Sequence, residues 1–175
     1  MRPDDVAEFS AFVRARSGAL FRTAVLLTGD RGQAEDLVQS TLERLCRHWR
    51  TVSRAQAPEA YARRVLVNLV YDRHRLRRRA GTEVLLGDSG PPSPGSDAYQ
   101  QILSRDELMR GLRALPVSMR TVLVLRYFED LADTEIAALL GIRESTVRSQ
   151  AARGLGKLRA RAGDKAAGPT RGGTR

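Results

Sequence analysis

The chain has 175 residues, enough for one modest domain or two small ones, and its formal net charge is +10. A strongly basic protein is expected to bind a polyanion, and both nucleic acid and an anionic membrane surface fit that description. No apolar run approaches the roughly eighteen residues that a membrane span needs, and the acidic start MRPDDVAEFS is unlike a signal peptide, so we expect no membrane insertion and a cytoplasmic location.

Charge and composition divide the chain into four segments. Residues 1–79 are basic and helical in pattern, and residues 99–162 repeat both properties. Between them, residues 80–98 are acidic and rich in Gly, Pro and Ser, which predicts a flexible acidic linker. A plain tether and a tether with a role of its own both fit that composition. Residues 163–175 are poor in apolar side chains and predict a disordered basic tail.

The first helix that the pattern predicts follows Asp30, which can form a capping box with Gln33. Apolar residues then recur at three- and four-residue steps and predict one buried face: Ala34, Leu37, Val38, Thr41, Leu42, Leu45 and Trp49. The opposite face is acidic and amide-rich, and it consists of Glu35, Asp36, Gln39 and Glu43. A face of this kind is usually exposed to solvent and has no further role.

Pro58 is placed as the first residue of the next helix, a position that tolerates the missing N–H of proline. Its apolar residues Tyr61, Val65 and Leu69 repeat every four positions and predict a buried face. The helix continues into the basic segment RHRLRRR, residues 73–79.

The segment TVLVLRYF, residues 121–128, has the β-branched content of a strand. Pro116 and the helical patterns on either side favour a helix instead, and a helix is our prediction.

Residues 131–159 have the pattern of a helix-turn-helix motif. Ala137, Gly141 and Val147 supply the small residue, the turn residue that tolerates positive φ, and the apolar anchor that the motif needs. Asp133 is predicted to cap the first helix. The outer side of the second helix carries groups that bond phosphates and base edges, namely Ser145, Thr146, Arg148, Ser149 and Arg153. This pattern favours a DNA-reading motif over an ordinary helical hairpin in a small bundle.

No set of residues in the sequence is arranged for catalysis or metal binding. His48 and His74 lack partners at ligand spacing, and the segment ARGLGKL lacks the first glycine and the Ser/Thr of a phosphate-binding loop. The lone Cys46 excludes an intrachain disulfide and fits simple packing. We therefore expect no metal, no cofactor and no enzymatic activity.

Four segments in chain order resemble the extracytoplasmic-function (group IV) sigma factors of bacterial RNA polymerase, of actinobacterial type. They are AEDLVQSTLERL (34–45), YARRVLVNLVYDRHR (61–75), LPVSMRTVLVLRYFEDL (115–131) and EIAALLGIRESTVRSQ (135–150). The resemblance implies an all-α fold of two small helical domains joined by the flexible acidic linker, the C-terminal one a helix-turn-helix domain. It also implies that the protein binds core RNA polymerase and directs it to promoter DNA, and it allows an anti-sigma factor as a further partner.

For residues 1–79 the resemblance implies binding to core polymerase and to the −10 element. The residues implied in core binding are Asp36, Gln39 and Leu42, and Ser40 stands where the family usually has an acid. A loop at residues 51–57, together with the helix that carries Asn68, matches the part that captures an unstacked base. The residues implied in −10 DNA binding are Arg54, Arg63, Arg64, Asn68, Arg73 and Arg75.

For residues 99–162 the resemblance implies that the second helix of the motif reads the −35 element. The implied contacts are Ser145, Thr146, Arg148, Ser149 and Arg153. Arg143 stands where a capping Ser is usual, and Gln150 replaces a common Arg, so the preferred hexamer is expected to differ from that of other members.

Two other functions remain open from the residues alone. A stand-alone helix-turn-helix DNA-binding transcriptional regulator would account for residues 131–159, but it would leave the acidic face of residues 35–43 and the acidic linker without a purpose. An RNA-modifying enzyme that uses the basic surface would need a nucleophile, metal or cofactor site.

Overall fold

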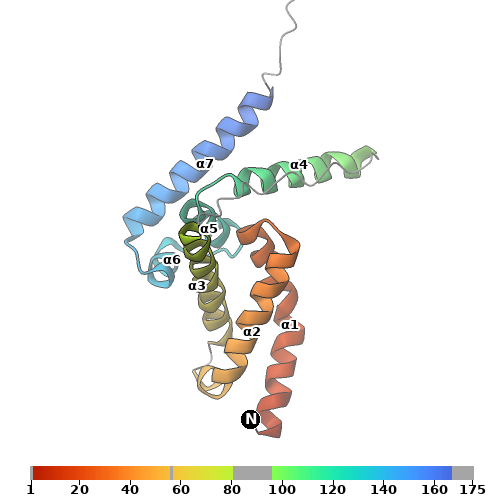
Figure 1. The fold of residues 1–175 in the computed structure, drawn as a ribbon, viewed down its shortest axis with the longest axis vertical. Helices are drawn as coiled ribbons and strands as arrows, with labels where there is room; N and C mark the ends of the chain where they lie inside the picture. The colour runs from red at the N-terminus through yellow and green to blue at the C-terminus, as the bar shows by residue number, and fades with distance from the viewer. Residues whose placement is uncertain (1, 56, 81–95, 167–175) are drawn as a thin grey trace, which may run out of the picture. The chain divides into compact units, whose positions relative to one another are not determined.

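The structure is a computed structural model that describes residues 2–55, 57–80 and 96–166, with side chains in residues 2–55, 57–80 and 105–162. Within these residues the chain forms seven helices and no strand, which confirms the all-α prediction (Figure 1). The helices are α1 (Pro3–Thr28), α2 (Arg31–Arg54), α3 (Pro58–Arg79), α4 (Ser96–Arg113), α5 (Val117–Tyr127), α6 (Asp133–Leu140) and α7 (Glu144–Ala166). The chain divides into two compact units, Met1–Gln101 and Ile102–Arg175.

The predicted linker and tail fall largely outside the described residues. Of the linker, residues 81–95 lie outside them, and α4 begins at Ser96, so residues 96–98 are helical. Of the tail, residues 167–175 lie outside, and α7 continues to Ala166. The extra helical turn includes Lys165 and Ala166, both good helix formers, which extend a helix that already exists at little cost.

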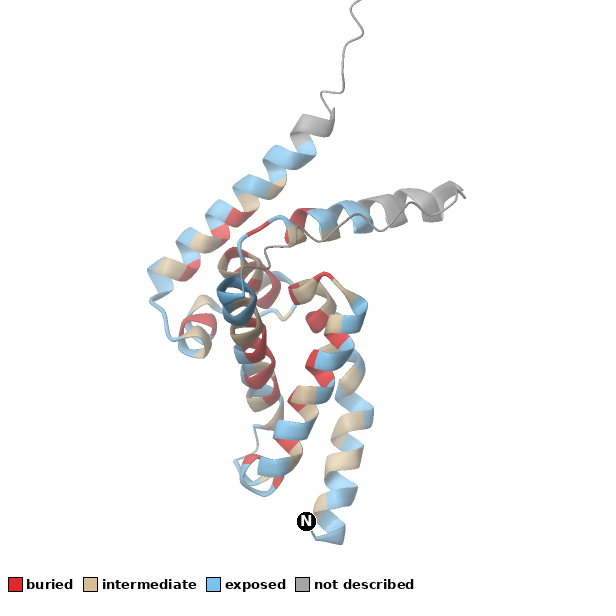
Figure 2. Ribbon diagram, in the orientation of Figure 1, coloured by how far each residue is buried: buried red, intermediate tan, exposed pale blue. Residues whose placement is uncertain are grey.

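The N-terminal unit is built around α2, against which α1 and α3 both pack. The predicted apolar face of α2 is buried, apart from Leu42, which is half-buried (Figure 2). Trp49 is 3% exposed and lies at the centre of an aromatic group, with ring centroids 5.2 Å from Phe9 and 5.4 Å from Phe12. Both phenylalanines come from α1, a helix that has no counterpart among the predicted elements.

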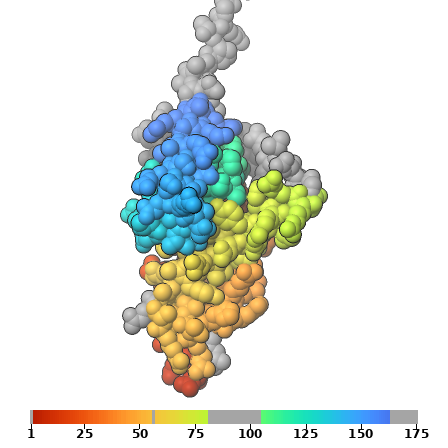
Figure 3. All heavy atoms as spheres, turned by 90° about the vertical axis from the view of Figure 1, so that its left-hand side faces the viewer, coloured from red at the N-terminus to blue at the C-terminus, as the bar shows by residue number. Residues whose placement is uncertain are grey.

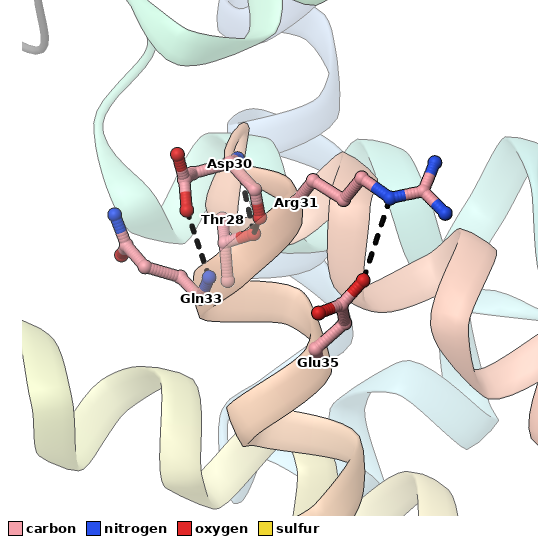
Figure 4. Close-up of polar contacts among 5 residues, drawn as sticks. All are labelled: Thr28, Asp30, Arg31, Gln33 and Glu35. Carbon is pink, nitrogen blue, oxygen red and sulfur yellow. Dashed lines mark hydrogen bonds and ion pairs between the residues drawn. The ribbon is translucent and has the colours of Figure 1, made fainter.

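A tight turn joins α1 to α2 (Figure 4). Gly29 adopts a left-handed conformation with φ of 73°, which glycine reaches without steric cost. Asp30 caps α2 as predicted, because its carboxylate accepts a hydrogen bond from the main-chain N–H of Gln33 at 2.7 Å. The second half of the predicted capping box is absent: the main-chain N–H of Asp30 donates to the hydroxyl of Thr28 at 3.3 Å, which leaves the Gln33 side chain available for another contact.

In the C-terminal unit, α7 packs against both α5 and α6. The predicted helix at residues 121–128 is confirmed as α5, whose Val122 and Val124 are buried. Burial of an apolar helix face therefore outweighs β-branched propensity here. At Gly154 of α7, an added Cβ would lie 2.9 Å from the Leu123 side chain, so the glycine allows α7 to approach α5 closely.

A half-buried arginine, Arg120, ties the end of α4 to α5. The guanidinium of Arg120 donates hydrogen bonds to the main-chain oxygens of Arg113 at 3.0 Å and Leu115 at 3.1 Å. Burial lowers the pKa of Arg120, and the neighbouring positive charge of Arg113 lowers it further. Arg120 thus satisfies carbonyl groups that the end of a helix leaves without intrahelical partners.

Candidate nucleic-acid interface

The helix-turn-helix of the C-terminal unit is formed by α6, a short turn and α7. Gly141 ends α6 in the left-handed conformation with φ of 67°, as the sequence predicts. The main-chain N–H groups of Gly141 and Ile142 both donate to the carbonyl of Ala137, which closes the turn. Val147 is fully buried and anchors α7. These contacts fix which side of α7 faces outward.

The prediction that Asp133 caps α6 is wrong. Ala132 is the N-cap residue, and its main-chain N–H donates to the carboxylate of Glu135 at 2.8 Å. Asp133 is the first helical residue, and its carboxylate instead forms an ion pair with Arg126 of α5 at 3.4 Å. The helix begins one residue earlier than predicted, so Asp133 occupies the first helical position and its carboxylate does not cap the main-chain N–H groups.

The outward face of α7 carries the predicted DNA-contacting residues. Ser145, Arg148, Ser149 and Arg153 are exposed, and Thr146 is half-buried. This helix is open to solvent on the side that Figure 3 turns toward the viewer. Four of the five side chains are therefore fully accessible to a ligand, and the fifth is partly accessible.

The two departures from the family pattern, Gln150 on α7 and Arg143 just before it, lie in different environments. Gln150 is half-buried, and its side-chain oxygen accepts a hydrogen bond from the hydroxyl of Ser118 on α5 at 3.5 Å. Gln150 therefore faces the packed side of α7. Arg143 is exposed ahead of the helix, and its main-chain oxygen accepts hydrogen bonds from the N–H groups of Thr146 and Val147.

The acidic face predicted on α2 lies at the surface of the N-terminal unit. Asp36 and Gln39 are both exposed, and the Gln39 amide donates to the Glu43 carboxylate at 3.1 Å. Glu35 is paired with Arg31 at 3.4 Å (Figure 4). Leu42 differs from Asp36 and Gln39 because it packs against the core around Trp49.

The predicted loop at residues 51–57 is wrong over most of its length. Helix α2 continues through Arg54, and the N–H of Ala55 donates to the carbonyl of Thr51 at 3.3 Å. No residue before Pro58 is incompatible with a helix, and Val52 is buried against the core, which favours extension of the last turn. Arg54 is exposed at the end of the helix.

Helix α3 carries its basic residues on two different sides. Arg64, Asn68 and Arg75 are exposed and are separated by four and seven residues, so they form one outward stripe. Arg63 is half-buried beside this stripe. Arg73 lies about 180° around the helix from Arg64.

Gln33 binds the arginines on the inner side of α3, a contact that sequence reasoning missed. The guanidinium of Arg73 donates to the Gln33 main-chain oxygen at 3.2 Å, and that of Arg77 donates to the Gln33 side-chain oxygen. Arg75 instead pairs with Asp72 on α3 itself. Arg73 thus has a contact that links α3 to the start of α2.

Among the side chains that the structure describes, no group of His, Cys, Asp and Glu residues could hold a metal ion. No helix in the described part of the chain is both long and apolar enough to cross a membrane.

Comparisons with known proteins match both units. Residues 12–80 match the sigma-70 region 2 family, and residues 105–158 match the sigma-70 region 4 family. The chain is 37% identical over 155 residues to the RNA polymerase sigma-E factor of Streptomyces coelicolor, covering 89% of this chain and 86% of that protein. It is 31% identical over 148 residues to the ECF RNA polymerase sigma factor SigL of Mycobacterium tuberculosis, covering 83% and 84% of the two chains.

Two solved structures have a similar fold. The sigma factor RpoE of Bartonella quintana, in complex with the anti-sigma factor NepR, superposes with a TM-score of 0.72 at 22% identity, over 89% of this chain and 96% of that one. CnrH, in complex with the cytosolic domain of CnrY, superposes with a TM-score of 0.59 at 23% identity, over 87% and 85%.

Proposed function

Because the chain belongs to the extracytoplasmic-function sigma factors of RNA polymerase, we propose that its two units divide the recognition of core polymerase and promoter DNA between them. The protein is a sigma factor that directs transcription initiation from promoters. In the proposed division, residues 1–79 bind core polymerase and the −10 element, residues 99–162 bind the −35 element, and residues 80–98 connect them. The protein acts in the cytoplasm, where the polymerase is.

One observation carries the proposal for the C-terminal unit. The turn at Gly141 and the buried anchor Val147 leave an outward face on α7 with exposed hydroxyl and guanidinium groups, the groups that contact phosphates and base edges in a major groove. We assign −35 contacts to Ser145, Thr146, Arg148, Ser149 and Arg153. Gln150 is left out of this set because it faces α5.

For the N-terminal unit we assign core binding to the exposed pair Asp36 and Gln39, with Leu42 supporting them from the core. The −10 assignment rests on the outward stripe of Arg64, Asn68 and Arg75, together with Arg54 and Arg63. An anti-sigma factor is a further proposed partner, as in the Bartonella complex.

Run-off transcription with purified core polymerase tests the function. The full chain should cause core polymerase to start at a defined site on its promoter, and core polymerase alone should not. A stand-alone regulator would bind the DNA without giving this start, and none of the comparisons supports that alternative.

The exposed position of Asn68 leads to a prediction about promoter opening. Asn68→Ala should still bind core polymerase and the closed promoter but should form fewer open complexes, because capture of a flipped base differs from binding of phosphates. Permanganate footprinting measures the unstacked thymines of the open complex. Undiminished thymine reactivity in the variant would remove Asn68 from the −10 assignment.

The two sides of α3 lead to a second prediction. Arg75→Ala should lower the slope of log affinity against log salt by about one unit for holoenzyme binding to promoter DNA, because one phosphate contact is lost. Arg73→Ala should leave that slope unchanged and instead destabilise the contact of α3 with α2 by about 1 kcal/mol. The two variants remove the same charge from the same helix, so each is a control for the other. If both variants lower the salt slope equally, Arg73 also binds DNA, and the division of the α3 arginines into two sides with different roles is wrong.

A further inference from the structure

The outward face of α7 contains a small hydrogen-bonded group formed by Thr146, Ser149 and Arg153. The Ser149 hydroxyl donates to the main-chain oxygen of Thr146 at 3.0 Å. The Arg153 guanidinium donates twice to Ser149: Nε to its main-chain oxygen at 3.3 Å, and Nη2 to its hydroxyl oxygen at 3.4 Å. All three bonds lie on the face that is proposed to enter the major groove.

These bonds determine what the Ser149 hydroxyl can offer to a ligand. A serine hydroxyl has one hydrogen to donate and two lone pairs to accept with. The hydrogen is directed to the carbonyl of Thr146, a common back-bond within helices, so the outer side of the oxygen presents only lone pairs. Phosphate oxygens, N7 of guanine and N7 of adenine are all acceptors, and this hydroxyl has no donor left for them.

The lone pairs of Ser149 face Arg153, which is exposed and forms no ion pair within the described residues. An exposed arginine has high rotamer entropy, and fixing it on DNA binding costs about 0.5–1.5 kcal/mol. Two bonds to Ser149 restrict the guanidinium before DNA arrives. Arg148 has no hydrogen bond of this kind among the described side chains, and it lies about 140° around the helix from Arg153.

We propose that Ser149 is a positioning residue: it acts on −35 recognition by holding the Arg153 guanidinium in place for one base pair, and it does not itself contact a base. This inference rests on the proposed function of α7 as the −35-reading helix. It changes the role assigned to Ser149 and leaves Arg148 and Arg153 as separate readers of different base pairs.

The test uses holoenzyme, the full chain assembled with core polymerase, and a pool of promoter duplexes in which the −35 hexamer is randomised. Base preferences come from sequencing the bound fraction. Arg153→Ala should lose about tenfold of the preference at one base pair, equivalent to about 1.4 kcal/mol. Ser149→Ala should lose about threefold at that same base pair. The double variant should match Arg153→Ala alone, since a positioning residue has no effect once the group it positions is gone.

Two further variants separate positioning from helix stability and from direct contact. Ser149→Thr keeps a hydroxyl at this site and should retain the wild-type preference. Ser145→Ala is the matched control, because it removes a hydroxyl one turn earlier on the same face, and any effect it has should add to that of Arg153→Ala. Since Ala has a higher helix propensity than Ser, Ser149→Ala should not lower the thermal stability.

The inference fails if Ser149→Ala has no effect on base preference, if it alters a different base pair, if its effect adds in full to that of Arg153→Ala, or if Ser149→Thr loses the preference. In those cases the proposed function still stands, provided that Arg153→Ala reduces the base preference at one position of the −35 hexamer. If Arg153→Ala leaves every base preference intact, the −35 assignment of Arg153 in the proposed function fails, and the positioning role of Ser149 fails with it.

Discussion

Replacing Trp49 with Ala should destabilise the N-terminal unit by about 3–5 kcal/mol, the usual cost of truncating a buried tryptophan. Trp49 is 3% exposed, and its ring contacts Phe9 and Phe12 of α1. It also belongs to the core in which Leu45 and Val52 of α2 meet Ala62 of α3. Its removal therefore leaves a cavity where α1, α2 and α3 meet.

Hydrogen exchange of the full chain, followed by mass spectrometry, is the suitable measurement. Each unit can unfold separately, so a single melting temperature for the chain would not be well defined. Protection should fall in α1, α2 and α3 and remain unchanged in α5 and α7, which serve as the internal control. Fluorescence cannot serve, because Trp49 is the only tryptophan.

Trp49→Phe gives a sharper test of the same packing. The indole N–H of Trp49 is buried without a hydrogen-bond acceptor among the described residues, so replacement by Phe removes an unsatisfied donor along with part of the ring. The expected loss is about 1–2 kcal/mol, well below that of the Ala variant. If Trp49→Phe and Trp49→Ala lowered the free energy of unfolding equally, the indole N–H would have a hydrogen-bond acceptor. Lost packing alone would then not explain the destabilisation.

The elements that sequence reasoning predicted correctly are those whose signal is local. The buried face of α2 follows from apolar spacing over residues 34–49, and its start follows from the cap at Asp30. The turn at Gly141 follows from the need for a residue that adopts positive φ without strain. In each case the residues that determine the structure lie within one or a few turns of one another.

The errors arise where a local signal competes with a distant partner or is too weak to set a boundary. Asp133 is a favourable cap residue, yet it pairs with Arg126 from another helix. Residues 51–54 have no strong helix signal, yet Val52 is buried in the core and keeps them helical. Both outcomes depend on packing between helices, which periodicity within one helix does not contain.

The basic segment at residues 73–79 shows the same limit at a proposed binding site. As a sequence it is one cluster of cations, and all its members have equal claims to DNA phosphates. The structure separates them by helical angle and by the contacts of Gln33, which lies forty residues earlier in the chain than Arg73. A charge run on a helix is therefore better treated as two faces, each with its own partners.

The second large effect is expected on binding to core polymerase, from changes on the outer face of α2. Asp36→Ala combined with Gln39→Ala should weaken binding by roughly tenfold to a hundredfold, because a hydrogen bond to a charged group contributes about 1.5–3 kcal/mol. Both side chains are exposed and make no contact with the core of the unit. The variant loses only the bond from Gln39 to Glu43, so its fold and stability should be nearly unchanged.

Glu35→Ala is the matched control for this pair, because it removes one acidic charge from the same exposed turn of α2 and leaves Asp36 and Gln39 in place. If general attraction between charges drives binding, Glu35→Ala and Asp36→Ala should weaken it alike, and added salt should remove the difference from wild type. If the two side chains dock on the polymerase directly, only the Asp36 and Gln39 changes should matter. A titration of labelled protein with core polymerase distinguishes the two cases, and equal affinity of the double variant and the wild type would show that this face of α2 does not bind the polymerase.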